Sequence, residues 1–486
     1  MTSIFQSLRL SQLHDHSVRR GHAEIAVSGG SHHHAPPRLN PIPHFQVFFL
    51  IICGICAADC NAETSSESRL PNNVGFVIVN SLDALQLNAL RDHVKVRLKP
   101  GVYTLSHATS HRFMRFTGND SHYDLRGVTL RVDTRLFRQF GKPGGVDGFY
   151  RVIDLVGERS VFEGARIETF GDLPGIQSRN KIINVTGSGA ILKDVEITTA
   201  GSSPWGYGSL YGISGRDVRK MNGIRVGWPA IGARIVNCRV HMRAMGHGIF
   251  VQGASDTSIE NCHVDGLLRP TRDILAEKSG YAFDRGFKTA GRGYIEGVMV
   301  GNQGEILPDE MISLSEDGIR LYGQGAGHPT GPTSILRCSV RQMRRGICTG
   351  LGPAADRMID CEVRDCVAAG FNIGSGDAVE RCRADAKYAE ALSCPYGSSK
   401  GVRVDLEILD SRRGLANNLL ATINGRTHII RLRTARDAFV PRDMVIALGT
   451  QRGYSSNKGE APPTREIELI NMTPAKVIHD ETTIGR

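Results

Sequence analysis

A short motif centred on cysteine recurs along the chain at a regular spacing. It consists of an apolar residue, one or two others, Cys, one other residue and a small or apolar residue, and its cysteines are Cys238, Cys262, Cys338, Cys361 and Cys382. Successive cysteines are 24, 76, 23 and 21 residues apart. A period of 21 to 24 residues is typical of a solenoid, in which each repeat packs only on its neighbours. We interpret the spacing of 76 as about three turns of the same period with inserted loops.

The composition favours short strands and tight turns over long helices. The 486 residues include 56 glycines, and only 6% are aromatic. No helical repeat accompanies the motif, which leaves leucine-rich repeats as a weak alternative. We therefore predict an all-β chain that forms a right-handed parallel β-helix, a solenoid whose coils contribute two or three strands each and stack about 4.8 Å apart.

Side chains at the same point of each coil should form ladders up such a stack. We expect the five cysteines to be one ladder of small, buried, reduced thiols rather than disulfides or a metal site. Earlier copies of the motif place Gly127, Gly164 and Asp194 where the later copies have cysteine.

A second motif has the form x-Gly-Ile/Phe-x-apolar. Its copies begin at Asn222, His247, Asp317, Arg345, Ala369 and, more weakly, Arg413. The Ile and the residue two later should point into the coil, and the glycine should permit a bend. The first position varies among polar and charged types, whereas a core position would hold Ile or Val. We interpret it as a functional surface, with a turn-capping polar column as the alternative.

The chain divides into four expected segments. Residues 1–62 form a leader with a signal peptide, 63–112 an N-terminal segment and cap, 113–435 the β-helix, and 436–486 a less regular C-terminal tail. The apolar run over 45–56 is too short to span a bilayer comfortably and fits the apolar part of an export signal. We expect a secreted or periplasmic protein with no stable membrane span.

The net charge of +10 indicates acidic partners. No RNP, zinc-finger or helix-turn-helix signature supports nucleic acid, which favours an acidic polymer. The segment from Arg269 to Arg292 holds six basic and three acidic residues, and we expect it to form a loop wall beside the site, with a solvated insertion as the alternative. Trp205 and Tyr207 lie in a glycine-rich loop that could bind sugar rings or pack locally.

Four stretches resemble a known family. Residues 96–105 are similar to the cap-to-first-coil segment of secreted β-helix polysaccharide enzymes. The stretches 246–250, 269–277 and 316–322 resemble segments of bacterial right-handed β-helix proteins of the polysaccharide-lyase kind, which have the pectate-lyase-like fold. The resemblance covers roughly residues 75 to 435 and implies cleavage of an acidic polysaccharide such as alginate by β-elimination. It implies that His247, Arg269, Asp273, Arg320 and Tyr322 lie at the cleft.

The chemistry of elimination suggests a role for each of these residues. A lyase removes the C5 proton of a uronate, stabilises the charge that develops on its carboxylate and protonates the departing O4. Arg269 and Arg320 could neutralise the carboxylate. His247 is the candidate base and Tyr322 the candidate acid, or the reverse, and Lys288 is an alternative base. Asp273 is expected to orient an arginine.

Further residues are expected to bind substrate: Trp205, Asn222, Arg243, Arg272, Lys288, Asp317 and Arg345. No cofactor or metal site is expected, and Ca²⁺ is the alternative. Acidic residues that could hold Ca²⁺ include Asp273, Glu277, Asp309, Glu310, Glu316 and Asp317, but their spacing specifies no coordination sphere. We expect the protein to act as a monomer.

Three other functions are compatible with the sequence. Glycoside hydrolysis needs two carboxylates, and the chain has Asp317 but no Asp-Asp pair on the neighbouring coil. A C5-epimerase would use the same groups as a lyase. A non-catalytic carbohydrate-binding β-helix would bind a polyuronate and release no product.

Overall fold

The computed structural model describes ten segments of the chain: residues 75–138, 150–171, 178–202, 205–208, 219–280, 283, 305–350, 352–412, 418–449 and 464–479. They all belong to one unit, residues 70–486. The expected leader with its apolar run, and the candidate base Lys288, lie outside the described residues. Among the described residues, no helix has the length and apolar character needed to cross a membrane.

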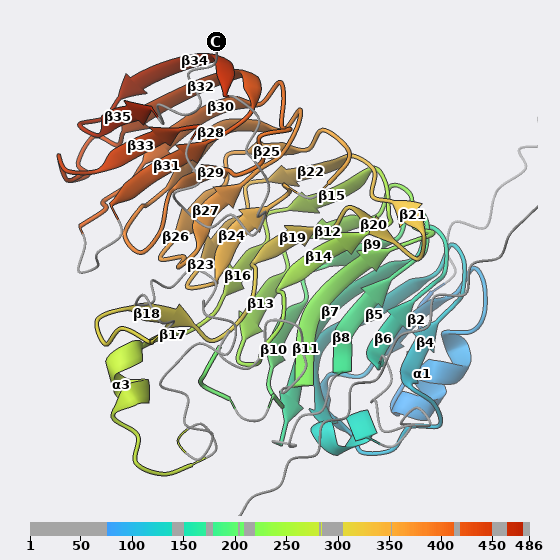
Figure 1. Cartoon of the computed structure of the whole chain (residues 1–486). Coiled ribbons are helices and arrows are strands. Elements are labelled where there is room, and N and C mark those ends of the chain that lie inside the picture. The colour runs from blue at the N-terminus through green and yellow to red at the C-terminus, as the bar shows by residue number, and fades with distance from the viewer. Residues whose placement is uncertain are drawn as a thin grey trace, which may run out of the picture. The chain divides into compact units, whose positions relative to one another are not determined.

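The first of two long sheets runs along one side of the coil stack (Figure 1). Its strands are β1 (Val77–Val79), β2 (Lys95–Leu98), β3 (Gly101–Leu105), β5 (His122–Asp133), β7 (Val161–Phe170), β9 (Ile191–Lys193), β10 (Glu196–Thr199), β12 (Arg234–Val236), β13 (Arg239–Met242), β15 (Thr257–Glu260), β16 (His263–Asp265), β22 (Thr333–Leu336), β23 (Ser339–Arg341), β25 (Arg357–Ile359), β26 (Glu362–Arg364), β28 (Ala378–Ala384), β30 (Arg403–Ile408), β32 (Arg426–Thr434) and β34 (Arg465–Met472).

The second long sheet runs along the opposite side of the coils. In spatial order its strands are β4 (Arg112–Phe116), β6 (Arg151–Leu155), β8 (Ser178–Val185), β11 (Arg219–Gly227), β14 (Ile249–Gln252), β19 (Ile319–Leu321), β24 (Arg345–Cys348), β27 (Ala369–Asn372), β29 (Leu392–Cys394), β31 (Leu419–Ile423), β33 (Val445–Leu448) and β35 (Lys476–His479). Every pairing that joins described strands of the two long sheets is parallel, and the chain is a right-handed parallel β-helix, as predicted.

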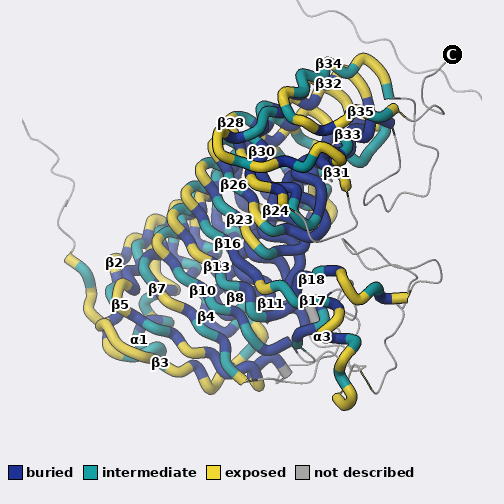
Figure 2. Tube along the Cα trace, turned by 90° about the vertical axis from the view of Figure 1, so that its left-hand side faces the viewer, coloured by how far each residue is buried: buried dark blue, intermediate teal, exposed yellow. Residues whose placement is uncertain are grey.

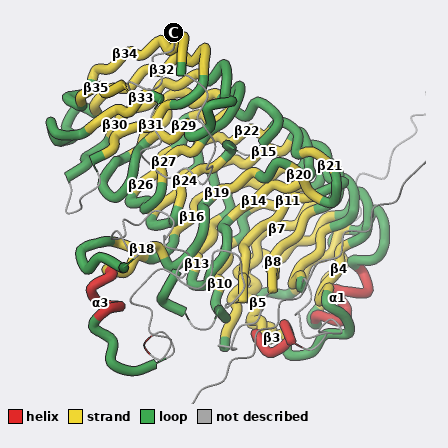
Figure 3. The backbone as a smooth tube through the Cα atoms, in the orientation of Figure 1, coloured by secondary structure: helices red, strands yellow, loops and turns green. Residues whose placement is uncertain are grey.

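The remaining elements are short (Figure 3). They are α1 (Leu82–Asn88), the 3-10 helix η1 (Thr134–Arg138), α3 (Thr271–Leu275), the antiparallel pair β17 (Leu268–Pro270) and β18 (Met311–Ser313), and the hairpin β20 (Gln324–Gly325) with β21 (His328–Pro329). Helix α1 follows β1 and buries Leu85, and the side chain of Ser81 caps it by accepting a hydrogen bond from the amide of Ala84.

The Gly-Ile motif forms a ladder inside the coils. Ile224, Ile249, Ile319 and Ile347 pair in register on successive strands and are fully buried, as predicted. The glycine is required for space rather than for a bend, because its backbone is not left-handed. A Cβ on Gly318 would lie 2.2 Å from Cγ1 of Val340, which enters the core from the first sheet. Figure 2 shows the buried residues along the inside of the stack.

The predicted cysteine ladder is present. The Sγ atom of Cys338 accepts a hydrogen bond from the amide of Cys262 at 3.4 Å, and all eight described cysteines are buried and free. Strand β15 pairs directly with β22, so the 76 residues between these cysteines make one coil with a long insertion. The expected three turns are wrong, because the insertion contains α3 and the β17–β18 and β20–β21 pairs instead of further coils.

The earlier copies of the motif are aligned differently from the prediction. Gly164 and Asp194 are in register with Asn237, the residue before Cys238, and Val195 takes the cysteine position. The position before the cysteine turns the chain between two strands in the left-handed region, with φ of 82° at Gly164, 55° at Asp194 and 53° at Asn237. Glycine, asparagine and aspartate tolerate this conformation best, which explains the pattern.

The coils continue past the expected boundary at residue 435. Strand β34 pairs with β32, while β33 pairs with β31 and β35 with β33. Ile446 and Ala447 of β33 are fully buried. The described residues 436–449 and 464–479 therefore include strands that extend the coils, where a less regular tail was expected.

Candidate functional site

The middle of the second sheet is buried on both faces. Described residues of β19, β24 and β27 are all buried, whereas β12 and β25 of the first sheet alternate between buried and accessible positions. Because the inner face is apolar, the outer face must bury polar side chains. Such groups require partners, and this face is where the polar residues of the Gly-Ile motif lie.

The predicted polar column exists on this face. The amides of Gly223, Gly248 and Gly318 donate to the carbonyls of His247, Asp317 and Arg345 at 2.9, 3.1 and 2.9 Å. Asn222, His247, Asp317 and Arg345 therefore lie on successive coils. All four are buried, so the column is a packed polar layer rather than an open surface.

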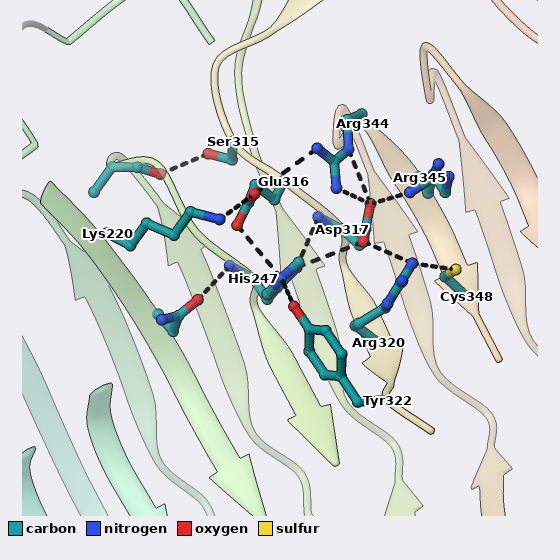
Figure 4. A network of polar contacts seen from close by, with 12 residues as sticks. Lys220, His247, Ser315, Glu316, Asp317, Arg320, Tyr322, Arg344, Arg345 and Cys348 are labelled. Atoms are coloured by element: carbon teal, nitrogen blue, oxygen red, sulfur yellow. Dashed lines mark hydrogen bonds and ion pairs between the residues drawn. The ribbon is translucent and has the colours of Figure 1, made fainter. Parts of the chain in front are cut away.

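His247 lies at the centre of the network in Figure 4. Its Nδ1 accepts a hydrogen bond from the backbone amide of Asp317 at 3.2 Å, and its Nε2 lies 2.7 Å from the hydroxyl of Tyr322 and 3.4 Å from Oε2 of Glu316. A backbone amide can only donate, so Nδ1 carries no proton. The neutral ring then holds its proton on Nε2 and donates it to Tyr322.

The charge state of His247 follows from its surroundings. Burial lowers its pKa to about 4, although the carboxylates of Glu316 and Asp317 act in the opposite direction. Lys220 and Arg344 lower it further. His247 is therefore neutral at pH 7, which agrees with the proton position deduced from its hydrogen bonds.

Tyr322 is the member of this pair that is partly accessible. Its side chain follows β19, whereas the side chain of His247 is only 6% exposed. Burial raises the pKa of Tyr322 well above its usual value, so the hydroxyl keeps its proton. Since that hydroxyl accepts from Nε2 of His247, its own proton is directed elsewhere and can be donated. The guanidinium of Arg320 lies 5.1 Å from the centre of the Tyr322 ring.

Two carboxylates anchor the network. Glu316 pairs with Lys220 at 2.5 Å. Asp317 pairs with Arg344 at 3.0 Å, Arg320 at 3.2 Å and Arg345 at 3.5 Å. Burial alone would raise the pKa of Asp317, but the three arginines outweigh it and hold the pKa well below its usual range.

Five residues of the network in Figure 4 were not predicted as site residues: the charged Lys220, Glu316 and Arg344, and also Ser315 and Cys348. Glu316 was considered only as a calcium ligand. A signal was available in the sequence, because Glu316 and Arg344 directly precede Asp317 and Arg345 in their motif copies, and Lys220 lies two residues before Asn222. The motif was aligned only from its first polar position, which omitted them.

Arg269, Arg272 and Asp273, the described residues predicted from the basic insertion, make no hydrogen bond or ion pair with this network. Arg269 on β17 binds the carboxylate of Glu277 and the carbonyl of Gly206, and its guanidinium stacks 5.4 Å from the centre of the Tyr207 ring. On α3, Arg272 and Asp273 are exposed and lie 3.9 Å apart. The expected placement of Arg269 and Asp273 at the His247 cleft stays a prediction, and the described contacts of Arg269 are with Glu277 and the 205–208 loop.

Two more predicted residues lie apart from the cluster. Arg243 pairs with Asp265 at 2.8 Å beside β16 of the first sheet. Trp205 is half-buried in the 205–208 loop. Arg243 reaches this carboxylate because it lies just past β13, on the far side of the coil turn from the Gly-Ile motif.

Metal binding finds no support in this geometry. Among the described residues, no group of three His, Cys, Asp or Glu side chains could hold a metal ion. Three of the six carboxylates considered as alternative calcium ligands form ion pairs: Glu316 and Asp317 with lysine and arginine, and Glu277 with Arg269.

Comparison with known proteins gave matches only among solved structures. No family model and no curated protein matches the chain. A pectate lyase is 11% identical with a TM-score of 0.39, covering 77% of this chain and 76% of its own. A rhamnogalacturonan lyase is 11% identical with a TM-score of 0.40, covering 80% of each chain. A polygalacturonase from Erwinia carotovora is 10% identical with a TM-score of 0.38, covering 82% and 94%. The reaction therefore has to be argued from the site itself.

Proposed function

We propose that this protein degrades an acidic, uronate-containing polysaccharide such as alginate by β-elimination, with Tyr322 as the proton donor. The observation that carries the proposal is the hydroxyl of Tyr322, which accepts the Nε2 proton of a buried, neutral His247 beside the guanidinium of Arg320. A hydroxyl held this way presents its own proton outward, next to a cation that suits a carboxylate.

The proposed step uses these groups as follows. A base takes the C5 proton of the uronate as the C5–H bond breaks and a C4–C5 double bond forms, while the C4–O4 bond breaks and Tyr322 protonates O4. Arg320 stabilises the charge on the uronate carboxylate. Its Nε is buried and makes no hydrogen bond within the described part of the chain. His247 then acts as a positioning residue, and Lys288 remains the candidate base.

This assignment changes the predicted role of His247. A base must offer a free lone pair to the substrate. The Nδ1 lone pair of His247 accepts from the Asp317 amide, and Nε2 bears the proton. The geometry supports the predicted role of Tyr322 as the acid and favours neither His247 as the base nor the exchange of the two roles.

Hydrolysis has weaker support. It requires two carboxyl groups that flank the scissile bond. Glu316 and Asp317 are buried and paired with lysine and arginine side chains, which makes them poor as a base or nucleophile. Epimerisation at C5 and binding without cleavage remain alternative outcomes of the test.

We also propose that the protein acts outside the bacterial cytoplasm as a monomer without a required cofactor. The apolar run over 45–56 motivates the location. Appearance of the chain in the periplasmic or medium fraction would test it, and retention of the full-length chain in the cytoplasm would contradict it.

The reaction is tested by following near-ultraviolet absorbance with alginate, polyglucuronate and pectate in turn. Elimination predicts rising absorbance with one polymer, because the product carries a new double bond conjugated to the carboxylate. New reducing ends without absorbance would indicate hydrolysis. With neither signal on any polymer, cleavage would be rejected, and C5 epimerisation would be tested by exchange of the C5 proton with solvent.

A further inference from the structure

An exposed tryptophan lies at the end of β11, outside the network described above. Trp228 is 45% exposed, and its ring stacks on that of His328, with centroids 4.3 Å apart and planes within 8°. A large aromatic side chain that is exposed gains hydrophobic free energy when a ligand or another surface covers it. Its flat ring offers the kind of surface on which a sugar ring can pack.

The fold holds this stack in place. His328 belongs to the β20–β21 hairpin, whose ends are tied to the neighbouring coil. The amide of Gly253 donates to Oγ1 of Thr330 at 2.8 Å, and the amide of Gly331 donates to the carbonyl of Ala254 at 2.9 Å. A Cβ on Gly325 would lie 2.4 Å from the carbonyl oxygen of Gln252. The hairpin therefore packs backbone against backbone, which fixes the position of His328.

An arginine lies next to the stack. The guanidinium of Arg225 folds over Gly227, where an added Cβ would lie 2.1 Å from Nη1. It donates to Oδ1 of Asn184 at 2.9 Å and to Oε1 of Gln252 at 3.3 Å. Among the described residues no carboxylate lies within ion-pair distance of it, and Asp154 acts on its charge only from farther away. The side chain is partly accessible.

The surrounding face of the second sheet is also basic. Asp154 is in register with Asn184, which is in register with Arg225. Asp154 lies 3.3 to 3.9 Å from three arginines, Arg151, Arg112 and Arg115. Four arginines and one aspartate therefore share the outer face of β4, β6 and β11, which favours an anionic ligand there.

This surface lies beside the candidate site. Phe250 is in register with Arg225 on one side and Arg320 on the other, so two coil steps, about 10 Å, separate the two arginines. The amide of Tyr322 donates to the carbonyl of Val251, and that of Trp228 to the carbonyl of Gln252. A polymer that reaches Tyr322 and follows the sheet toward β4 would pass Arg225 and Trp228.

We propose that Trp228 and Arg225 form a subsite for a carboxylated sugar of the polymer. The pyranose ring packs on Trp228, and the carboxylate of the sugar forms an ion pair with the guanidinium of Arg225. This deepens the proposed function, on which it rests for the class of polymer. It predicts that the protein selects acidic over neutral sugars at a position away from the bond that breaks.

The test uses the two tryptophans of the chain, Trp205 and Trp228. In full-length W205F carrying Y322F to prevent turnover, Trp228 is the sole tryptophan reporter. Uronate tetrasaccharides from alginate, pectate and polyglucuronate are titrated against their carboxyl-reduced, neutral forms. The expected result is a saturable change in Trp228 emission with an acidic tetrasaccharide, at an affinity at least tenfold higher than for its neutral form.

Two variants separate charge from position. R225Q should lower the affinity for the acidic tetrasaccharide about tenfold and leave the neutral one unchanged. G227A should do the same with the charge retained, because its methyl group displaces the guanidinium. The reciprocal chain with W228F and Y322F, which keeps Trp205, is the control. Circular dichroism confirms that each variant is folded.

The inference and the proposed function can fail separately. If an acidic polymer is cleaved by the wild-type chain while Trp228 emission is unchanged, or acidic and neutral sugars bind alike, the subsite is rejected and the function stands. If Trp228 responds selectively to acidic sugars and no polymer is cleaved, the subsite stands and elimination is rejected.

Discussion

At the scale of single residues, the environment of His247 assigns different tasks to two neighbouring groups. Its imidazole is a natural candidate base because its usual pKa lies near neutrality. Burial lowers that pKa to about 4, and the Asp317 amide occupies Nδ1. The ring can then hold and orient Tyr322 but cannot accept a proton from a substrate. Tyr322, partly accessible and still protonated, is left as the donor.

Replacing Tyr322 with Phe tests this division. Y322F removes the hydroxyl and keeps the ring, so we expect turnover to fall roughly 10²- to 10⁴-fold with a small change in KM. Steady-state rates on the cleaved polymer measure the effect. Y103F is the matched control, because the Tyr103 hydroxyl bonds the carbonyl of Lys99 near the N-terminal end of the stack. Turnover within twofold of wild type in Y322F would remove Tyr322 from the mechanism.

Glu390 carries a prediction about pH. Its carboxyl group is buried with Oε1 unbonded, and burial raises its pKa to about 7. A raised folded pKa contributes stability that is complete below the unfolded pKa and is lost as pH rises through 7. From the shift of the pKa from 4.5 to about 7, the loss is about 3 kcal/mol.

Replacing Glu390 with Gln should remove this loss. We expect E390Q to unfold at higher urea concentration than wild type at pH 8 and at a similar concentration near pH 4. Urea unfolding at both pH values measures the difference. E468Q changes an exposed glutamate on β34 and serves as the control. A variant less stable than wild type at pH 8 would show that the Glu390 carboxylate is stabilising.

At the scale of elements, the Gly-Ile strands and the cysteine turns are built to meet inside the coil. On four coils, glycine leaves room on the second sheet for a valine from the first, so a small residue packs opposite a branched one. The turn before each cysteine needs a left-handed residue, which explains Asn237 and Asp194. The Gly-Ile motif and the cysteine motif, which lie on different sheets, together determine the cross-section of each coil.

The pair Gly318 and Val340 tests this fit. G318A places a methyl group 2.2 Å from Cγ1 of Val340, and overpacking of this kind costs about 1–3 kcal/mol. V340A in the same chain removes the obstructing methyl groups, so the double variant should be less destabilised than the sum of the two single variants. Urea unfolding of the four chains measures this coupling. Additive effects would show that the cost of G318A does not come from the contact with Val340.

At the scale of the whole molecule, the coil stack extends through β33, β34 and β35. Leu420, Ile423, Ile430 and Leu432 of the preceding coil are all fully buried. Removing everything after residue 435 would expose the end of this core and the edges of β31 and β32. Exposed strand edges of this kind pair with other copies of the chain.

Truncation therefore has a clear expected outcome. A chain ending at 435 should melt at a lower temperature and elute as aggregates in size-exclusion chromatography. A chain ending at 479, which loses only residues outside the described part, is the control and should behave like the full chain. Equal melting temperatures for the two would mean that the last strands are dispensable, as an irregular tail would be.

The sequence by itself determined the fold class, the cysteine ladder and the polar column. These follow from periodicity, because residues that recur every 21 to 24 positions come to lie above one another when successive coils stack in register. Periodicity placed Asn222, His247, Asp317 and Arg345 in one column, whereas the resemblance to β-helix polysaccharide lyases placed Arg320 and Tyr322 beside His247.

Only the tertiary structure decided what lies between the repeats and which group does what. The insertion between Cys262 and Cys338 has no period, so its residue count suggested coils that do not exist, and the contacts of Arg269 with Glu277 and the 205–208 loop could not be predicted. Glu316, Lys220 and Arg344 were missed because ion pairs across coils depend on side-chain direction. The role of His247 depends on one backbone amide and on burial, and neither property is encoded in the identity of the histidine.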